Sequence, residues 1–260
     1  VKILLRAYGL LLAVFMLAPL VLIVWMSFTP DEFFKLPTHE FTLRWYRQVF
    51  AHPGFVDAFV LSLRLAVVSA LVASVLAFFA AYAIVRFDFP GRGALDALFM
   101  SPMIVPAVVF GIAVLQFLNR FGLYNTFASL VAAHVIVVVP FALRAINAAL
   151  REVPQELEWA AMNLGASRLR ALRSVTLPIA LKGVAAGFIF AFIMSFDEVT
   201  VTIFMTGPAY QTLPLRIYNY LSDQVDPTVA AVSSLLILLS LVLILILDRV
   251  GGLKTVSYTH

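Results

Sequence analysis

Six long runs of apolar residues most constrain what this chain can fold into. Each run has about the 20 residues that an α-helix needs to cross the hydrocarbon core of a bilayer. Of the 260 residues, 63% are hydrophobic and 12% are charged, whereas soluble domains have ~25% charged residues. The sequence therefore predicts an all-α polytopic membrane protein, a single domain over residues 1–260 with six transmembrane helices. The runs are Gly9–Phe28, Phe59–Val85, Leu98–Leu118, Phe127–Ile146, Gly183–Met205 and Val229–Leu247.

Three other features of the sequence bear on its fold and function. The third run contains Pro102 and Pro106, so its helix should be kinked or broken near its start. The chain has no cysteine, which excludes disulfides, thiolate chemistry and cysteine-ligated metals. The net charge of +4 comes from basic residues in short loops between apolar runs, and it does not indicate nucleic-acid binding.

The lysines and arginines predict the orientation of the helices. Cytoplasmic loops are richer in these residues than outer loops, and an inside N-terminus gives twelve inner against five outer residues, with Arg64 within a span. Both termini are therefore expected in the cytoplasm. The inner set is Lys2, Arg6, Arg86, Arg92, Arg144, Arg151, Arg168, Arg170, Arg173, Lys182, Arg249 and Lys254, and the outer set is Lys35, Arg44, Arg47, Arg120 and Arg216.

A polar stretch, Pro154–Ser167, separates the fourth and fifth runs on the inner side. Its helical spacing predicts one apolar stripe. Pro154 suits a helix start and Gly165 a left-handed stop, and a second short helix from about Arg168 should end at Pro178. The stretch could rest on lipid headgroups, helped by nearby arginines, or dock into a cytoplasmic partner. The stripe consists of Leu157, Ala160, Ala161 and Leu164.

This stretch resembles the signature loop of ABC-importer permeases. That signature reads Glu-Ala-Ala, three residues, Gly, nine residues, an aliphatic residue, any residue, then Leu-Pro. The chain departs from it at Trp159, where the signature has Glu, and Glu158 comes one residue early. The positions in register are Ala160, Ala161, Gly165, Val175, Leu177 and Pro178.

The resemblance extends to the permeases of spermidine/putrescine importers. It is carried by segments 206–210, 212–215, 217–218 and 226–231, which include Gly207-Pro208-Ala209. It implies a type I permease fold in the bacterial inner membrane, a second permease subunit, two ATPase subunits and a periplasmic solute-binding protein. It also implies that residues 152–178 form the coupling loop, with Leu157, Glu158, Ala160, Ala161, Leu164 and Gly165 as the residues that contact the ATPase.

The chain itself has no phosphate-binding glycine loop, so ATP and Mg²⁺ are expected on the ATPase subunits. We therefore expect a non-catalytic permease subunit with no cofactor or metal of its own. A membrane enzyme would turn over without any ATPase. A membrane scaffold would need the polar stretch but not the acidic residues of the fifth run.

Asp197 and Glu198 interrupt the fifth run. Carboxylates within a span are costly and mark functional sites, and Asp197 lies roughly 22 Å from the cytoplasmic end at ~1.5 Å per residue. The resemblance implies that they attract a cationic solute, such as spermidine or putrescine. Because adjacent helical residues point about 100° apart, only one of the two should face a narrow pathway unless the helix is locally distorted. Alternatively, Arg64 lies at a matching depth and could neutralise one of them.

Two questions about the solute pathway stay open in the sequence. The solute could instead be an opine, a phosphonate or an amino-acid derivative, since Asp197-Glu198 differs from a two-aspartate pattern. Aromatic faces near the carboxylates could add cation–π contacts, although ordinary packing is favoured for these residues, which are Phe192, Phe196 and Phe204.

His134 is interpreted as a hydrogen-bonded packing residue of the fourth span.

Overall fold

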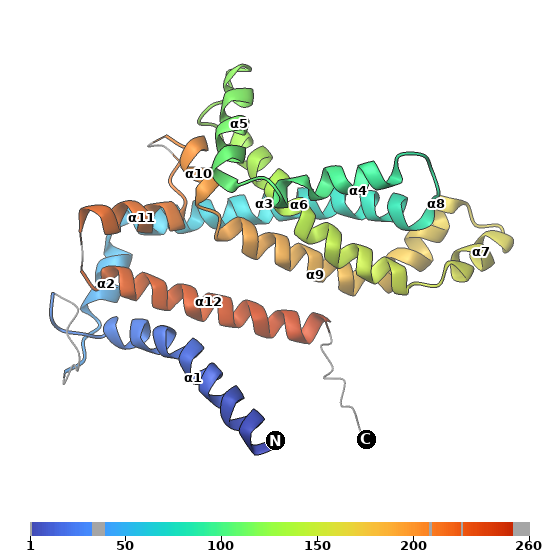
Figure 1. Ribbon diagram of the computed structural model, residues 1–260. Helices are drawn as coiled ribbons and strands as arrows, with labels where there is room; N and C mark the ends of the chain where they lie inside the picture. The colour runs from blue at the N-terminus through green and yellow to red at the C-terminus, as the bar shows by residue number, and fades with distance from the viewer. Residues whose placement is uncertain (1, 33–39, 208–209, 225, 252–260) are drawn as a thin grey trace. The chain divides into compact units, whose positions relative to one another are not determined.

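The computed structural model describes residues 2–32, 40–207, 210–224 and 226–251. Lys35, Pro208, Ala209 and Lys254, which the sequence analysis used, lie outside these ranges. All regular structure in the described residues is helical. By its internal contacts the chain divides into two compact units, residues 1–60 with 215–242 and residues 61–214 with 243–260, and Figure 1 traces the chain through them.

The longer helices are α1 (Lys2–Met26), α3 (Pro53–Arg86), α6 (Phe127–Glu152), α9 (Leu177–Phe196) and α12 (Thr228–Gly251). The remaining elements are α2 (Arg44–Ala51), α4 (Arg92–Met100), η1 (Ser101–Met103), α5 (Ala107–Asn119), α7 (Gln155–Asn163), α8 (Arg168–Ala171), η2 (Leu172–Thr176), α10 (Thr200–Met205) and α11 (Leu213–Asp223).

The predicted fold class, an all-α polytopic membrane protein, is confirmed. Among the described residues, five helical segments are long and apolar enough to cross a membrane, and the number rises to six when one bent pair is taken as a single span. The pair consists of Arg92–Met103 and Ala107–Asn119, which meet at 104°. The break falls where the prolines predicted it, because Pro102 lies in η1 and Pro106 caps α5 in an extended conformation.

In the first unit, a tyrosine holds three segments together. The hydroxyl of Tyr46 in α2 lies 2.7 Å from Ser27 Oγ, just after α1, and 2.7 Å from Ser234 Oγ in α12. The neighbouring Trp45 is buried and donates its indole N–H to the carbonyl of Thr29 at 2.7 Å. These bonds satisfy polar groups that burial would otherwise penalise.

In the second unit, α6 and α9 run side by side (Figure 1). They approach closely because two glycines of α9 face small or flexible residues of α6, as in many membrane helix pairs. Gly183 faces Ala149, and a Cβ at Gly187 would lie 3.0 Å from Ile146 Cγ1. A buried apolar cluster consists of Leu65, Leu118, Leu130, Ala133, Val201 and Met205.

The start of the fifth span differs from the sequence prediction. The helix was expected to stop at Pro178, but α8, η2 and α9 follow one another without a gap from Arg168 to Phe196. The prediction of a helix end at this proline is wrong because η2 is a π-turn and Pro178 lies in the first turn of α9. Proline is well tolerated in the first turn of an α-helix, where its fixed φ suits the helix.

Candidate functional site

The polar stretch folds as predicted into a short helix with defined ends. Pro154 is the N-cap of α7. After the last turn, Gly165 adopts the left-handed conformation at φ 92°. Its N–H donates to the Met162 carbonyl at 2.9 Å, while that of Ala166 donates to the Ala161 carbonyl at 3.1 Å. This pair of bonds is a Schellman motif, and its left-handed residue favours glycine.

The apolar stripe of α7 is accessible in the isolated chain. Leu164 is 90% exposed and Leu157 is 43% exposed, and between them Ala160 is exposed while Ala161 is half-buried. Trp159 is also exposed. Exposed leucines flanking small alanines form a surface that a groove on another protein or a lipid headgroup layer could cover.

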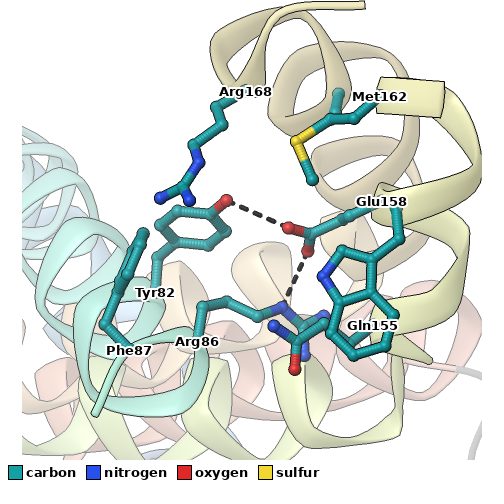
Figure 2. Close-up of a pocket in the computed structure, with 9 residues that line it drawn as sticks. Tyr82, Arg86, Phe87, Gln155, Glu158, Met162 and Arg168 are labelled. Carbon is teal, nitrogen blue, oxygen red and sulfur yellow. Dashed lines mark hydrogen bonds and ion pairs between the residues drawn. The ribbon is translucent and has the colours of Figure 1, made fainter. Parts of the chain in front are cut away.

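Glu158 points the other way, into the protein (Figure 2). Its Oε1 accepts from Arg86 Nε at 2.7 Å and from Thr176 Oγ1 at 2.7 Å. Its Oε2 accepts from the Tyr82 hydroxyl at 3.1 Å. Arg86 also donates to the Val153 carbonyl at 2.9 Å. We call the side chains of Tyr82, Arg86, Glu158 and Thr176 the Glu158 cluster.

The Glu158 cluster joins three segments that are distant in the chain. Tyr82 and Arg86 belong to the last turns of α3, Glu158 to α7, and Thr176 to the end of η2. A cavity of about 90 Å³ lies beside it. On the cavity wall the Arg168 guanidinium lies 5.7 Å from the ring centre of Phe87 (Figure 2). A displacement of α7 would therefore be transmitted to both α3 and α9.

The sequence singled out Glu158 as an ATPase contact and predicted neither its buried position nor its three partners. Arg86 and Tyr82 lie 72 and 76 positions away, and Thr176 lies 18 positions away. No local pattern predicts such contacts. The one usable signal was Arg86 itself, a charge at the predicted end of the second span.

The two carboxylates lie at a break in the fifth span. Helix α9 ends at Phe196 and α10 begins at Thr200, so Asp197 and Glu198 lie in the non-helical segment between them. Asp197 is exposed, and its carboxylate has no hydrogen-bond or ion-pair partner among the described residues. The fifth run is therefore not one continuous helix, and the break gives the two carboxylates separate environments.

Glu198 uses its carboxylate to begin the next helix. Its Oε1 accepts from the backbone N–H of Val201 at 2.8 Å, and its own carbonyl accepts from Thr202 Oγ1 at 2.9 Å. A carboxylate at this position satisfies a free N–H group and interacts favourably with the helix dipole. Asp197 is therefore the carboxylate that remains available.

The proposed internal ion pair does not form. Arg64 lies on an exposed position of α3, and the ion pairs among the described residues do not join it to Asp197 or Glu198. The sequence placed Arg64 and the two carboxylates at matching depths along their helices, but depth does not determine the direction in which a side chain points.

The aromatic residues near the carboxylates make ordinary packing contacts, which is the interpretation that the sequence favoured over cation–π contacts with solute. Phe192 and Phe196 are buried and stack on each other with ring centres 5.9 Å apart. Phe204 lies against α5, where a Cβ at Gly111 would come within 2.6 Å of its ring.

Comparison with known proteins agrees with these features. Residues 73–252 match the family described as "Binding-protein-dependent transport system inner membrane component". The chain is 32% identical over 241 residues to the spermidine/putrescine transport system permease protein PotC of Escherichia coli (strain K12), covering 93% of this chain and 91% of the relative. It is 27% identical to the putrescine transport system permease protein PotI of the same strain, over 86% and 82% of the two chains.

The fold is also found in a solved transporter. A chain of a bacterial ABC transporter involved in the import of the acidic polysaccharide alginate superposes with a TM-score of 0.73 at 18% identity, over 97% of this chain and 96% of that chain. The sequence match thus covers most of the chain, and the fold is shared with a solved transporter. The chain belongs to the family of binding-protein-dependent transport system inner membrane components, and it is a non-catalytic permease.

Proposed function

We propose that this permease moves a small cationic organic solute, such as the polyamines spermidine or putrescine, from the periplasm to the cytoplasm of a bacterium. The observation that carries the proposal is the carboxylate of Asp197, which is exposed and has no partner among the described residues, at the break that directly follows the long apolar segment Arg168–Phe196. Ionisable residues in membrane segments are rare and usually mark a pathway or a pairing partner. The similarity to the spermidine/putrescine permease PotC and the putrescine permease PotI supports a polyamine as the solute.

One structural detail favours a second candidate solute. Because Glu198 is engaged in capping α10, one carboxylate and not two remains available at the break. A single carboxylate neutralises one ammonium group, so an amino-acid derivative would also fit. Among the other candidates, an opine would fit through its amine, whereas a phosphonate would need a cation that the break does not supply.

We further propose that α7 couples the permease to an ATPase subunit. The exposed stripe of Leu157, Ala160, Ala161 and Leu164 would enter a groove of that subunit. Gly165 would set the exit angle of the chain from α7. Glu158 would act from the inside, because its bonds to Arg86 and Thr176 keep α7 fixed to the ends of α3 and η2.

The assembly that we propose has one further permease subunit, two ATPase subunits and a periplasmic solute-binding protein. ATP and Mg²⁺ would be held by the ATPase subunits. The excess of lysine and arginine in alternate loops supports cytoplasmic termini. This orientation places α7 on the side where ATP is available.

Reconstitution of the complete importer in proteoliposomes tests the proposed solute. Uptake of labelled spermidine should depend on the binding protein and on ATP, and unlabelled putrescine should compete. The competitor panel should also contain a monocationic amino-acid derivative, an opine and a phosphonate. Absence of binding-protein-dependent spermidine uptake, together with ATP-dependent uptake of a labelled member of this panel, would overturn the polyamine proposal in favour of the alternative.

A further inference from the structure

The buried histidine of α6 makes contacts on both sides of the break in the fifth span. His134 is fully buried. Its Nδ1 lies 2.8 Å from Ser195 Oγ, in the last turn of α9. Its Nε2 lies 3.0 Å from Thr202 Oγ1, in the first turn of α10. The interpretation of His134 as a hydrogen-bonded packing residue is confirmed. Its two bonds also connect the segments on either side of the break.

The hydrogen-bond pattern determines which ring nitrogen carries the proton. The hydroxyl of Thr202 has one hydrogen, and it donates that hydrogen to the Glu198 carbonyl at 2.9 Å. Thr202 Oγ1 must therefore accept from His134 Nε2–H. Nδ1 is then the unprotonated nitrogen and accepts from the Ser195 hydroxyl. Every donor and acceptor in this chain of bonds is satisfied by one neutral tautomer.

This chain of bonds ends at the segment that carries Asp197. It runs from Ser195 through His134 and Thr202 to the carbonyl of Glu198, and the side chain of Glu198 caps α10. Residues 197–199 belong to neither helix, although the Asp197 N–H donates to the Ile193 carbonyl at 3.1 Å and the Val199 carbonyl accepts from the Ile203 N–H at 3.0 Å. The imidazole adds a side-chain link across this break, from the last turn of α9 to the first turn of α10.

We propose that His134 is a positioning residue that fixes the break and so holds the Asp197 carboxylate in the solute pathway. The role of Asp197 rests on the proposed function above, whereas the bridge across the break does not. Buried polar networks of this kind give a unique arrangement when every member is satisfied. Loss of either hydroxyl partner should release the short α10 helix from α9.

A distance measurement tests the bridge without any transport assay. Because the chain has no cysteine, spin labels can be placed at Leu181→Cys and Ile203→Cys, two exposed positions on α9 and α10, in an importer whose other subunits lack cysteine. Thr202→Val removes the hydroxyl at nearly constant volume and should broaden the distance distribution. Thr206→Val is the matched control, since among the described residues that hydroxyl bonds to the Thr202 carbonyl of α10, the helix that it directly follows, and it should leave the distribution unchanged.

The bridge requires both of its ends. Ser195→Ala should therefore broaden the same distribution as Thr202→Val does. A wild-type distribution in either variant would overturn the proposal. Both substitutions reduce the side chain by little, so the fold should be retained, and the unchanged control would show that the labels report the bridge.

A double-mutant cycle tests whether the bridge acts through Asp197. Thr202→Val should lower the initial rate of solute uptake by about two- to tenfold, the range that loss of one hydrogen bond produces. In an Asp197→Asn background the same substitution should have no further effect. Equal losses in both backgrounds would overturn the positioning role. If Asp197→Asn itself has no effect on uptake, the proposed function fails, and the distance measurement still decides the bridge.

Discussion

The Nε atom of Arg86 lies 2.7 Å from Oε1 of Glu158, and both side chains are more than nine-tenths buried, with exposures of 6% and 8%. A buried ion pair is tolerated only while both charges are present, because removing one leaves the other unpaired in the protein interior, which solvates ions poorly. Here the pair joins the end of α3 to the exposed helix α7. It makes the position of α7 depend on the transmembrane helices.

Neutralising one member of this pair should therefore destabilise the protein and uncouple α7. Glu158→Gln leaves Arg86 buried and unpaired, which costs about 3–5 kcal/mol in comparable sites. The measurement is thermal unfolding of the purified importer, together with its solute-stimulated ATPase rate.

The matched control for this prediction is the exposed pair between Arg92 and Asp88, with exposures of 38% and 99%. Asp88→Asn should change stability by less than ~1 kcal/mol, because solvent screens exposed pairs. Equal destabilisation by Glu158→Gln and Asp88→Asn would contradict the role of the buried pair.

The exposed stripe of α7 should matter for the ATPase and not for folding. Leu164 is 90% exposed, so Leu164→Ser should leave thermal unfolding of the isolated chain unchanged. If the stripe enters a groove, loss of such a side chain should lower solute-stimulated ATP hydrolysis about fivefold or more. Glu156→Gln, on an exposed position of the same helix outside the stripe, should have little effect. An unaffected ATPase rate in Leu164→Ser would favour the alternative that the stripe rests on lipid.

Gly165 offers a test of backbone conformation alone. No atom lies within 4 Å of a Cβ built there, but its φ is 92°. Gly165→Val should therefore strain the backbone by about 1–2 kcal/mol without a clash, redirect the chain after α7 and impair ATPase coupling while the protein still inserts. Gly165→Asn should be tolerated better.

Gly93→Ala provides the control for Gly165, since that glycine also has open space but no positive φ. It should leave ATPase coupling intact. Impaired coupling by Gly93→Ala to the same degree would show that the effect at Gly165 is not conformational.

Close packing of α6 and α9 should make the glycines of their interface sensitive to size. A Cβ at Gly187 would lie 3.0 Å from Ile146 Cγ1 and 3.1 Å from the Ala142 carbonyl. Gly187→Ala should therefore lower the stability of the folded chain by about 1–3 kcal/mol, as overpacking does in other cores. Gly9→Ala, where nothing lies within 4 Å, should not. A stability unchanged by Gly187→Ala would mean that α6 and α9 separate easily.

The sequence predicted the parts of the fold that depend on local composition. Apolar run length identified the spans, Pro102 and Pro106 predicted the break in the third, and Pro154 and Gly165 predicted the ends of α7. Each of these features acts within a few residues of its own position, so its effect can be read from the local sequence.

The remaining features depend on contacts that a local pattern does not contain. The break at residues 197–199 lies between apolar segments and depends on Glu198 capping α10 and on His134 from another helix. Helix continuity through Pro178 depends on the π-turn before it. The inward position of Glu158 depends on Arg86, which is 72 residues away.

The two carboxylates of the break should behave differently, and this difference tests the central claim most directly. Glu198→Gln keeps an oxygen that can accept from the Val201 N–H, so solute uptake should stay within about twofold of the wild type, the small effect expected for loss of a charge–dipole interaction. Asp197→Asn removes the available charge at the same place. Initial uptake of labelled spermidine by the reconstituted importer should then fall at least about tenfold, which corresponds to ~1.4 kcal/mol of lost interaction. Wild-type uptake by Asp197→Asn, or an equal loss in the two variants, would contradict the account.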